Sequence, residues 1–140
     1  MAIVNLQIIK QNIKKMQRFS EKYIIAKEME WEELGGGVAR KFLGYDNQIM
    51  MVKVKFEKGA FGAPHQHFHT QATYCVSGKF EFVIDGEKKI VEGGDGIYIE
   101  PNLLHSALCL EEGMLIDTFS PVREDFLGGG EVSYFGDKEA

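Results

Sequence analysis

Residues 59–78 read GAFGAPHQHFHTQATYCVSG, and this stretch holds three of the four histidines in the 140-residue chain. His65 and His67 are separated by one residue, so an extended backbone points both imidazoles to the same side, because side chains alternate along a strand. Gln71 follows four residues later and joins them if the strand bends. The fourth histidine, His105, stands apart. Together these side chains would offer a divalent first-row metal ion three nitrogens and one amide oxygen.

The sequence around this stretch alternates as β-strands do. From Gly35 onward, short apolar runs are separated by turns that contain glycine. In residues 49–56 the even-numbered apolar residues share one face and the lysines share the other, which predicts a half-buried strand. Residues 79–84 predict another strand, and Asp85-Gly86 favours a two-residue hairpin turn into a strand at 87–91. Further turns are predicted at Gly93-Gly94, Pro101-Asn102 and Glu112-Gly113.

Composition favours one domain without disulfides. A chain of 140 residues with 44% hydrophobic residues can fill a single core. Cys75 and Cys109 would pair only if the fold brought them together, and two cysteines are too few for a disulfide framework. Free thiols in a reducing compartment are the expected state.

The charge distribution argues against nucleic acid as a ligand. Lys10, Lys14, Lys15 and Arg18 precede the first acidic residue, Glu21. They contribute +4 to the formal net charge of −5, which leaves −9 for the rest of the chain. Later basic residues are scattered among carboxylates, whereas phosphate binding needs a clustered basic surface. No stretch reaches the roughly 18 apolar residues that a membrane span requires.

The N-terminus predicts an amphipathic helix over residues 5–18, because Leu6, Ile9, Ile13 and Met16 recur at helical spacing. Lysines interrupt this region and no small-residue cleavage site follows, so it does not resemble a secretory signal, and a cytoplasmic location is expected. The helix is expected to pack on the domain or on a partner subunit rather than on a membrane surface. A homodimer is predicted, because a lone barrel keeps an open sheet edge and the apolar stripe needs cover.

The histidine segments resemble the two sequence motifs of the cupin superfamily. The first motif is matched position for position except that glutamine replaces the usual glutamate, in the pattern Gly59-x5-His65-x-His67-x3-Gln71-x6-Gly78. Gly94 and His105 fit the second motif, whereas its usual proline, glycine and asparagine are replaced by Glu100, Asn102 and Cys109. This resemblance implies an all-β fold, a single jelly-roll or double-stranded β-helix barrel. The expected organisation is an N-terminal helical extension at 1–32, a barrel at 33–127 and a C-terminal tail at 128–140.

The same resemblance implies one divalent transition metal ion, Ni, Zn, Mn, Fe or Co, held by His65, His67, Gln71 and His105. These ligands are neutral and leave the double charge of the ion uncompensated. The site should therefore attract an anion and favour Lewis-acid work over redox chemistry. On an extended strand His69 would point to the same side as His65 and His67. In the motif, however, its position is not one of the metal ligands. The alternative is a polar barrel face of histidines that binds no metal.

A narrower resemblance, to the KdgF-type pectin-degradation cupins, is carried by residues 115–126, which read LIDTFSPVREDF. Residues 31–41, WEELGGGVARK, and 78–86, GKFEFVIDG, are also similar to that family. Its members are associated with opening 4,5-unsaturated uronic acids from pectin or alginate into linear keto acids. The resemblance implies catalytic roles for Asp117 and Arg123, and substrate contacts by Phe119 and Arg123.

The residues themselves agree with part of this assignment. Asp117 interrupts the otherwise apolar strand predicted at 114–119, where a buried carboxylate is costly, and near a substrate it could move a proton. It could instead pair with a lysine or cap a backbone donor. Arg123 could clamp a carboxylate through two hydrogen bonds, or pair with Glu124 or Asp125 at the surface. Phe119, taken alone, is an ordinary core residue.

The sequence therefore predicts a metal-dependent sugar-acid isomerase acting on a small anionic uronate, with neither nucleic acid nor membrane as a partner. One alternative is a non-catalytic cupin that senses a small anion anchored on the metal. Another is an Fe(II)-dependent dioxygenase on the same barrel, which the neutral Gln71 disfavours.

Overall fold

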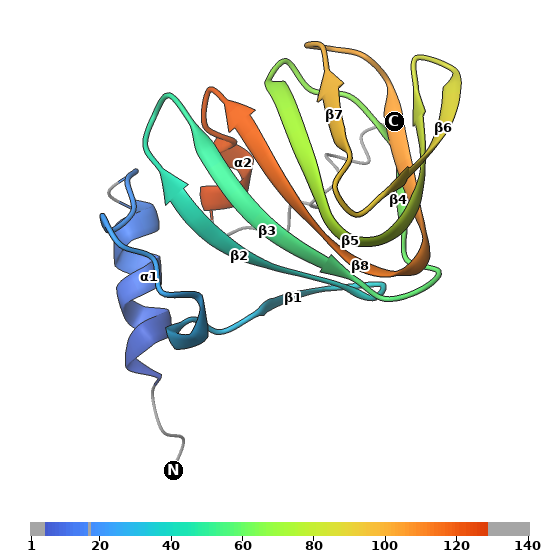
Figure 1. Ribbon diagram of the computed structural model, residues 1–140. Coiled ribbons are helices and arrows are strands. Elements are labelled where there is room, and N and C mark those ends of the chain that lie inside the picture. The colour runs from blue at the N-terminus through green and yellow to red at the C-terminus, as the bar shows by residue number, and fades with distance from the viewer. Residues whose placement is uncertain (1–4, 17, 129–140) are drawn as a thin grey trace.

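The computed structural model describes residues 5–16 and 18–128 of the chain, and its body is built of β-strands (Figure 1). The side chain of Met16 and all but the first residue of the predicted C-terminal tail lie outside the described residues. The elements follow in the order α1 Leu6–Met16, a 3-10 turn η1 Ala26–Glu28, β1 Glu32–Gly35, β2 Val38–Tyr45, β3 Met50–Phe56, β4 Phe61–His65, β5 Thr70–Ile84, β6 Glu87–Glu92, β7 Gly96–Ile99, β8 His105–Ser120 and α2 Glu124–Leu127.

All eight strands belong to one antiparallel sheet that curls round on itself (Figure 1). The strand order is β1-β2-β3-β8-β5-β6, with β4 also paired to β8 and β7 also paired to β5. Two long strands organise the fold, because β8 pairs with β5 over nearly its whole length, with β4 along its first half and with β3 along its second half. The predicted all-β architecture is confirmed.

The predicted alternation in β3 is confirmed and shows which face of the sheet is inside. Met50, Val52 and Val54 are fully buried and Phe56 nearly so, while Met51 is exposed. The inward residues of β5 and β8 complete the core, with Phe80 and Phe56 meeting edge to face at 5.2 Å. Cys75 and Cys109 are both buried in this core as free thiols, as predicted.

The turn at Asp85-Gly86 forms the predicted hairpin between β5 and β6, and both residues have the positive φ that this turn requires. The turn predicted at Glu112-Gly113 is wrong, because β8 runs through it without reversing. A Cβ on Gly113 would lie 2.2 Å from the Ser77 carbonyl oxygen and 2.7 Å from the Gly78 Cα. The glycine therefore permits a close approach of two irregular strands, not a reversal of the chain.

The predicted N-terminal helix exists and spans Leu6–Met16. It begins after Asn5, whose side-chain oxygen accepts hydrogen bonds from the backbone N–H groups of Gln7 and Ile8. The helix lies outside the sheet, near β2 (Figure 1), and Leu6, Ile9 and Ile13 remain substantially exposed on it. Across the described residues, no helix combines the length and apolarity needed to cross a bilayer.

Candidate metal centre and active site

Three histidines from two parts of the chain lie close together. His65 ends β4, His67 follows in the β4–β5 loop, and His105 begins β8 directly opposite His65 in the strand register. One ligand atom from each ring can be chosen so that all three lie within 4.8 Å of one another. The backbone N–H of Asn102 donates to the His67 carbonyl oxygen at 2.8 Å, so the predicted turn before His105 also anchors the His67 loop.

Backbone carbonyls fix the tautomer of each ring. A carbonyl oxygen only accepts, so the imidazole nitrogen facing it must carry the hydrogen and the other nitrogen of a neutral ring keeps its lone pair. The three contacts are Nδ1 of His65 to Ala63 at 2.8 Å, Nδ1 of His67 to His69 at 3.2 Å, and Nδ1 of His105 to Leu103 at 2.9 Å. All three Nε2 atoms are thereby left as potential metal ligands.

The Nε2 atom of His105 gives a direct test of whether a cation fits. It is buried, and within the described part of the chain no hydrogen-bond partner reaches it. A buried acceptor without a partner is costly in a folded protein. A divalent ion beside the three Nε2 atoms would remove this cost, so the residues present fit a metal.

The histidines are neutral at physiological pH, which metal binding requires. Burial, together with the charges of His105, His67 and Arg123, lowers the pKa of His65 from 6.5 to about 3. Burial and the neighbouring Arg123 and His105 lower the pKa of His67 to about 4. The pKa of His105 is also lowered, mainly by burial. The positive charge of Arg123 is thus felt throughout the cluster.

Gln71 brings an amide oxygen to the same place. It lies near the start of β5 with its side chain inward, and its Oε1 is 3.0 Å from Nε2 of His67. Its Nε2 donates to Oγ1 of Thr73 at 2.9 Å, which turns the oxygen toward the histidines. The structure therefore brings together all four side chains that the sequence suggested as metal ligands.

Asp117 lies on β8, on the same inner face, and is 4% exposed. Its strand register places it opposite Thr73, and Oδ1 accepts a hydrogen bond from the Thr73 hydroxyl at 2.7 Å. Sequence reasoning missed Thr73. The signal was present, because Gln71 and Thr73 are two residues apart on one strand and so share a face.

Phe119 and Arg123 complete this end of the barrel. The Phe119 ring packs edge to face on His67 at 5.7 Å, and the Arg123 guanidinium lies 5.1 Å from the Phe119 centroid. Arg123 is 2% exposed and donates from Nε and Nη2 to the two carboxylate oxygens of Asp125 at 3.0 and 2.7 Å. The predicted alternative partner is therefore present, but Arg123 is buried and Asp125 is half-buried rather than at the surface. Burial opposes ionisation of Asp125, yet the Arg123 hydrogen bonds and charge lower its pKa overall.

His69 is buried beside the cluster. Its ring stacks on Phe68 at 3.9 Å, and its Nδ1 finds no hydrogen-bond partner among the described residues. Burial is the main reason that its pKa is lowered, and a hydrogen bond with the Val122 backbone opposes that shift.

The cavity beside the histidines is small, about 30 Å³. A cavity needs roughly 10–15 Å³ to hold one water molecule, so there is room for an ion and a water. It is lined by Phe56, His65, Gln71, Phe82, His105, Ser106, Ala107, Leu115, Asp117, Phe119 and Arg123. Three of the four suggested ligands, His65, Gln71 and His105, thus line one space together with the buried carboxylate of Asp117.

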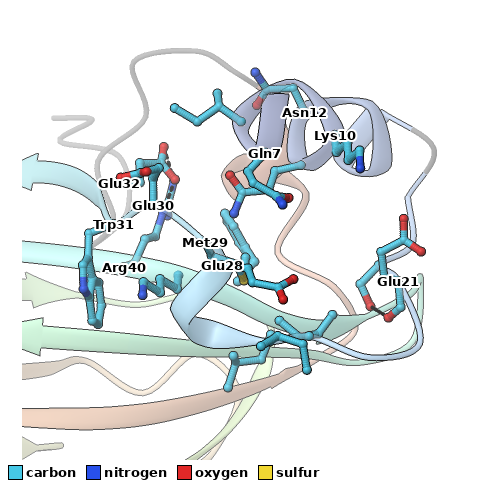
Figure 2. A pocket seen from close by; sticks show the side chains of 18 of the residues that line it. Gln7, Lys10, Asn12, Glu21, Glu28, Met29, Glu30, Trp31, Glu32 and Arg40 are labelled. Atoms are coloured by element: carbon cyan, nitrogen blue, oxygen red, sulfur yellow. Dashed lines mark hydrogen bonds and ion pairs between the residues drawn. The ribbon is translucent and has the colours of Figure 1, made fainter. Parts of the chain in front are cut away.

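A larger cavity of about 580 Å³ lies elsewhere, between α1, the segment around η1 and β2. Figure 2 shows Glu30 and Glu32 near Arg40 on one side of it and the helix residues Gln7, Lys10 and Asn12 on another. Its lining includes none of the four histidines. The larger cavity is therefore not the one that contains the candidate metal ligands.

Comparison with known proteins gives one family match and several relatives. Residues 52–116 match the family model described as the cupin domain. The pectin degradation protein KdgF of Dickeya dadantii (strain 3937) is 50% identical over 108 residues, which cover 76% of this chain and 98% of that protein.

Two solved structures are similar in both sequence and fold. An RmlC-like cupin from Shewanella frigidimarina NCIMB 400 has a TM-score of 0.77 and 43% identity, covering 78% of this chain and 98% of its own. KdgF from Halomonas sp. has a TM-score of 0.73 and 38% identity, covering 76% of this chain and 99% of its own. Both likenesses span nearly the whole of the other protein.

Proposed function

This chain belongs to the KdgF family of pectin-degradation cupins, and from that membership we propose that it opens 4,5-unsaturated uronates, derived from pectin or alginate, into linear keto acids. The predicted cupin barrel is confirmed by the same relatives. One observation supports the reaction most strongly. His65 and His105 belong to a group of three histidines whose ligand atoms lie within 4.8 Å of one another, and both line the same small cavity as the carboxylate of Asp117.

The proposed cofactor is one divalent transition ion, Ni, Zn, Mn, Fe or Co, held by His65, His67, His105 and Gln71. When bound, such an ion supplies Lewis-acid polarisation of substrate oxygens. The three imidazoles and the amide are all neutral, so the protein leaves the charge of the ion uncompensated. The nearby Arg123 adds a further positive charge, and both features favour an anionic substrate such as a uronate.

Asp117 moves the proton in this proposal. In the cyclic substrate an enol ether is joined to a hemiacetal. As the ring carbon–oxygen bond breaks, the hemiacetal hydroxyl loses its proton and becomes an aldehyde, and the ring oxygen becomes an enolate oxygen. A proton added at the neighbouring carbon then converts the enolate into a ketone. A carboxylate that accepts the first proton and returns it to carbon balances the reaction without a redox cofactor.

Arg123 and Phe119 bind the substrate in this proposal. The two hydrogen bonds to Asp125 use two of the five N–H groups of the guanidinium and hold it rigidly beside the cavity. The remaining N–H groups bind the substrate carboxylate. Phe119 supplies an apolar surface between Arg123 and His67.

The experiment that tests the proposal mixes the purified, metal-loaded chain with unsaturated galacturonate and follows the loss of the conjugated double-bond absorbance. We expect loss with the wild-type protein and none with metal-stripped protein or with His105→Ala. Equal rates in all three samples would refute a metal-dependent reaction.

The small cavity favours a second candidate, a non-catalytic cupin that senses a small anion. A space of about 30 Å³ suits an ion with one small ligand better than a whole sugar acid. The two functions differ in their need for Asp117, because a sensor has no use for a proton carrier. Full activity of Asp117→Asn in the biological pathway would favour sensing.

We propose further that the chain is organised as a helical extension at 1–32 and a barrel at 33–127, and that it forms a homodimer. β1 and β6 are the ends of the strand path, and the exposed apolar residues of α1 lie outside the sheet. Open sheet edges and apolar stripes are both surfaces that association covers.

A further inference from the structure

Three buried polar side chains form a chain of hydrogen bonds behind the metal centre. The Gln71 amide donates to the Thr73 hydroxyl oxygen at 2.9 Å, and that hydroxyl donates to Asp117 Oδ1 at 2.7 Å. All three residues are buried on the inner face of β5 and β8. Thr73 is the middle member, and the proposed reaction gives it no role of its own.

The direction of this chain is fixed by chemistry. A carboxylate only accepts hydrogen bonds, and the NH₂ group of an amide only donates them. The single hydroxyl hydrogen of Thr73 must therefore point to Asp117, and its oxygen lone pair is available to the amide NH₂ of Gln71. In this arrangement every group between Gln71 and Asp117 is satisfied.

The reversed amide does not satisfy the same groups. With Gln71 turned around, its oxygen would face Thr73, and the hydroxyl would have two acceptors for one hydrogen. Either Asp117 or the amide oxygen would then lose the hydrogen bond from the Thr73 hydroxyl, and the loss of a buried hydrogen bond is costly. The reversed amide would also present NH₂ hydrogens, which cannot bind a cation, toward His67.

We propose that Thr73 is a positioning residue that selects the amide oxygen of Gln71, rather than its nitrogen, as the fourth ligand of the metal centre. This inference rests on the proposed metal-dependent function and assigns a further residue to it. Thr73 touches neither the ion nor the substrate; it acts through Gln71 and holds Asp117 in place by the same hydroxyl.

The first test measures Ni²⁺ affinity of the full-length chain by competition with a chelator. Thr73→Val keeps the shape of the side chain and removes the hydroxyl, so the affinity should fall about 10- to 100-fold, the range for loss of a group that orients a ligand. Thr73→Ser keeps the hydroxyl and should restore most of the affinity. Thr118→Val is the matched control, because it makes the same change on the outer face of β8.

The second test asks whether the effect passes through the amide. A carboxylate has two equivalent oxygens, so either of its two orientations presents an oxygen to the metal. In a Gln71→Glu background, Thr73→Val should therefore change the Ni²⁺ affinity less than about threefold, far below the range expected for a lost orienting group. A loss as large as in the Gln71 background would mean that Thr73→Val acts by general disruption, and would overturn the proposal.

The outcomes separate this inference from the function on which it rests. If wild-type protein bound no Ni²⁺, the metal centre would be refuted and the role of Thr73 with it. If wild type and Thr73→Val bound Ni²⁺ equally, the centre would stand and the selecting role of Thr73 would be refuted. Should Thr73→Val fail to fold, Thr73→Ala also lacks the hydroxyl and is subject to the same expectations.

Discussion

Asp117 and Arg123 are both buried and charged, and both lie beside the same small cavity, yet their surroundings differ. Asp117 accepts a hydrogen bond from a neutral hydroxyl, whereas Arg123 is locked on Asp125 by two charged hydrogen bonds. A group that moves a proton must change its charge during turnover, and a group that binds a carboxylate must keep it. Their substitutions should therefore have different kinetic signatures.

We predict that Asp117→Asn lowers turnover by roughly two to four decades with little change in the Michaelis constant, because it removes titration but keeps shape. Arg123→Lys should chiefly raise the Michaelis constant, because it keeps the charge and loses the two-pronged geometry. Steady-state kinetics on unsaturated galacturonate measure both. Swapped signatures would swap the roles, and a lowered melting temperature of either ligand-free variant would indicate a structural ion pair instead.

The lowered pKa values of the histidines predict how stability without metal depends on pH. A histidine in the unfolded chain has a pKa near 6.5, while folding lowers the pKa of His65 to about 3 and that of His67 to about 4. Between these values the unfolded state binds more protons, so the free energy of unfolding is greatest above pH 6.5 and falls as the pH drops toward 4.

Denaturant unfolding of metal-stripped protein at pH 7 and pH 5.5 measures this difference. Carboxylates contribute little in that window because their ordinary pKa values, about 4, lie more than one unit below it. A variant with glutamine in place of His65, His67 and His105 should show a weaker pH dependence. Equal stability of the wild-type protein at the two pH values would contradict the lowered histidine pKa values.

At the scale of elements, the contact between β5 and β8 is closest where Gly78 and Gly113 pass each other. A methyl group on Gly113 would meet backbone atoms, which cannot move aside as the end of a side chain can. Gly44 on β2 offers a matched control, because a methyl group there would meet only the Ser20 hydroxyl oxygen, at 4.0 Å. Neither glycine has a positive φ, so only the space differs.

We predict that Gly113→Ala lowers the free energy of unfolding by about 1–3 kcal/mol or more, as forced overpacking does. Gly44→Ala should change it by less than about 0.5 kcal/mol, as a substitution without a steric conflict does. Denaturant unfolding of both variants makes the comparison. An equal effect of the two substitutions would show that the close approach is not what Gly113 provides.

These elements also show what could be predicted from sequence. Local patterns predicted three features that depend only on neighbours along the chain. These are the alternation of buried and exposed residues in β3, the hairpin at Asp85-Gly86 and the amphipathic helix α1. The spacing of the residues and the family motif together predicted the cluster of three histidines and one glutamine, His65, His67, His105 and Gln71. Local patterns fail where two distant segments determine the outcome.

Gly113 illustrates that failure, because its role depends on Ser77 and Gly78, more than thirty residues earlier. Glycine beside a polar residue predicts a turn when only the local sequence is considered. Thr73 was missed for a similar reason, since only the register between β5 and β8 places it opposite Asp117. Asp125 was one of two partners considered for Arg123, but the burial of Arg123 against Phe119 and Phe126 depends on packing between distant segments.

At the scale of the whole molecule, the surface that needs explanation is the N-terminal extension. Leu6 is 64% exposed and Ile13 48% exposed on a helix whose flanking charges are all basic, while the rest of the chain is acidic. Opposite charge favours association of this helix with the body of a second copy. The structure leaves both β1 and β6 at the ends of the strand path.

We predict that the chain sediments at micromolar concentration with about twice its own mass, because dimerisation covers the helix and a sheet edge. Removing residues 1–25 shows which of the two surfaces forms the dimer. A dimer that persists without the helix must use the sheet edge. A strict monomer both with and without these residues would refute the homodimer.

The second half of β8, residues 113–119, runs between β3 and β5, and this position has a consequence for deuterium exchange. Its amides cannot become accessible by fraying of an outer strand, so they should exchange only when the whole molecule opens. A metal ion that binds only the folded chain makes that opening rarer. Saturation with the ion should then slow exchange along this half of β8 by a common factor, even at Met114. Mass spectrometry of these protected amides would report occupancy of a centre they do not touch.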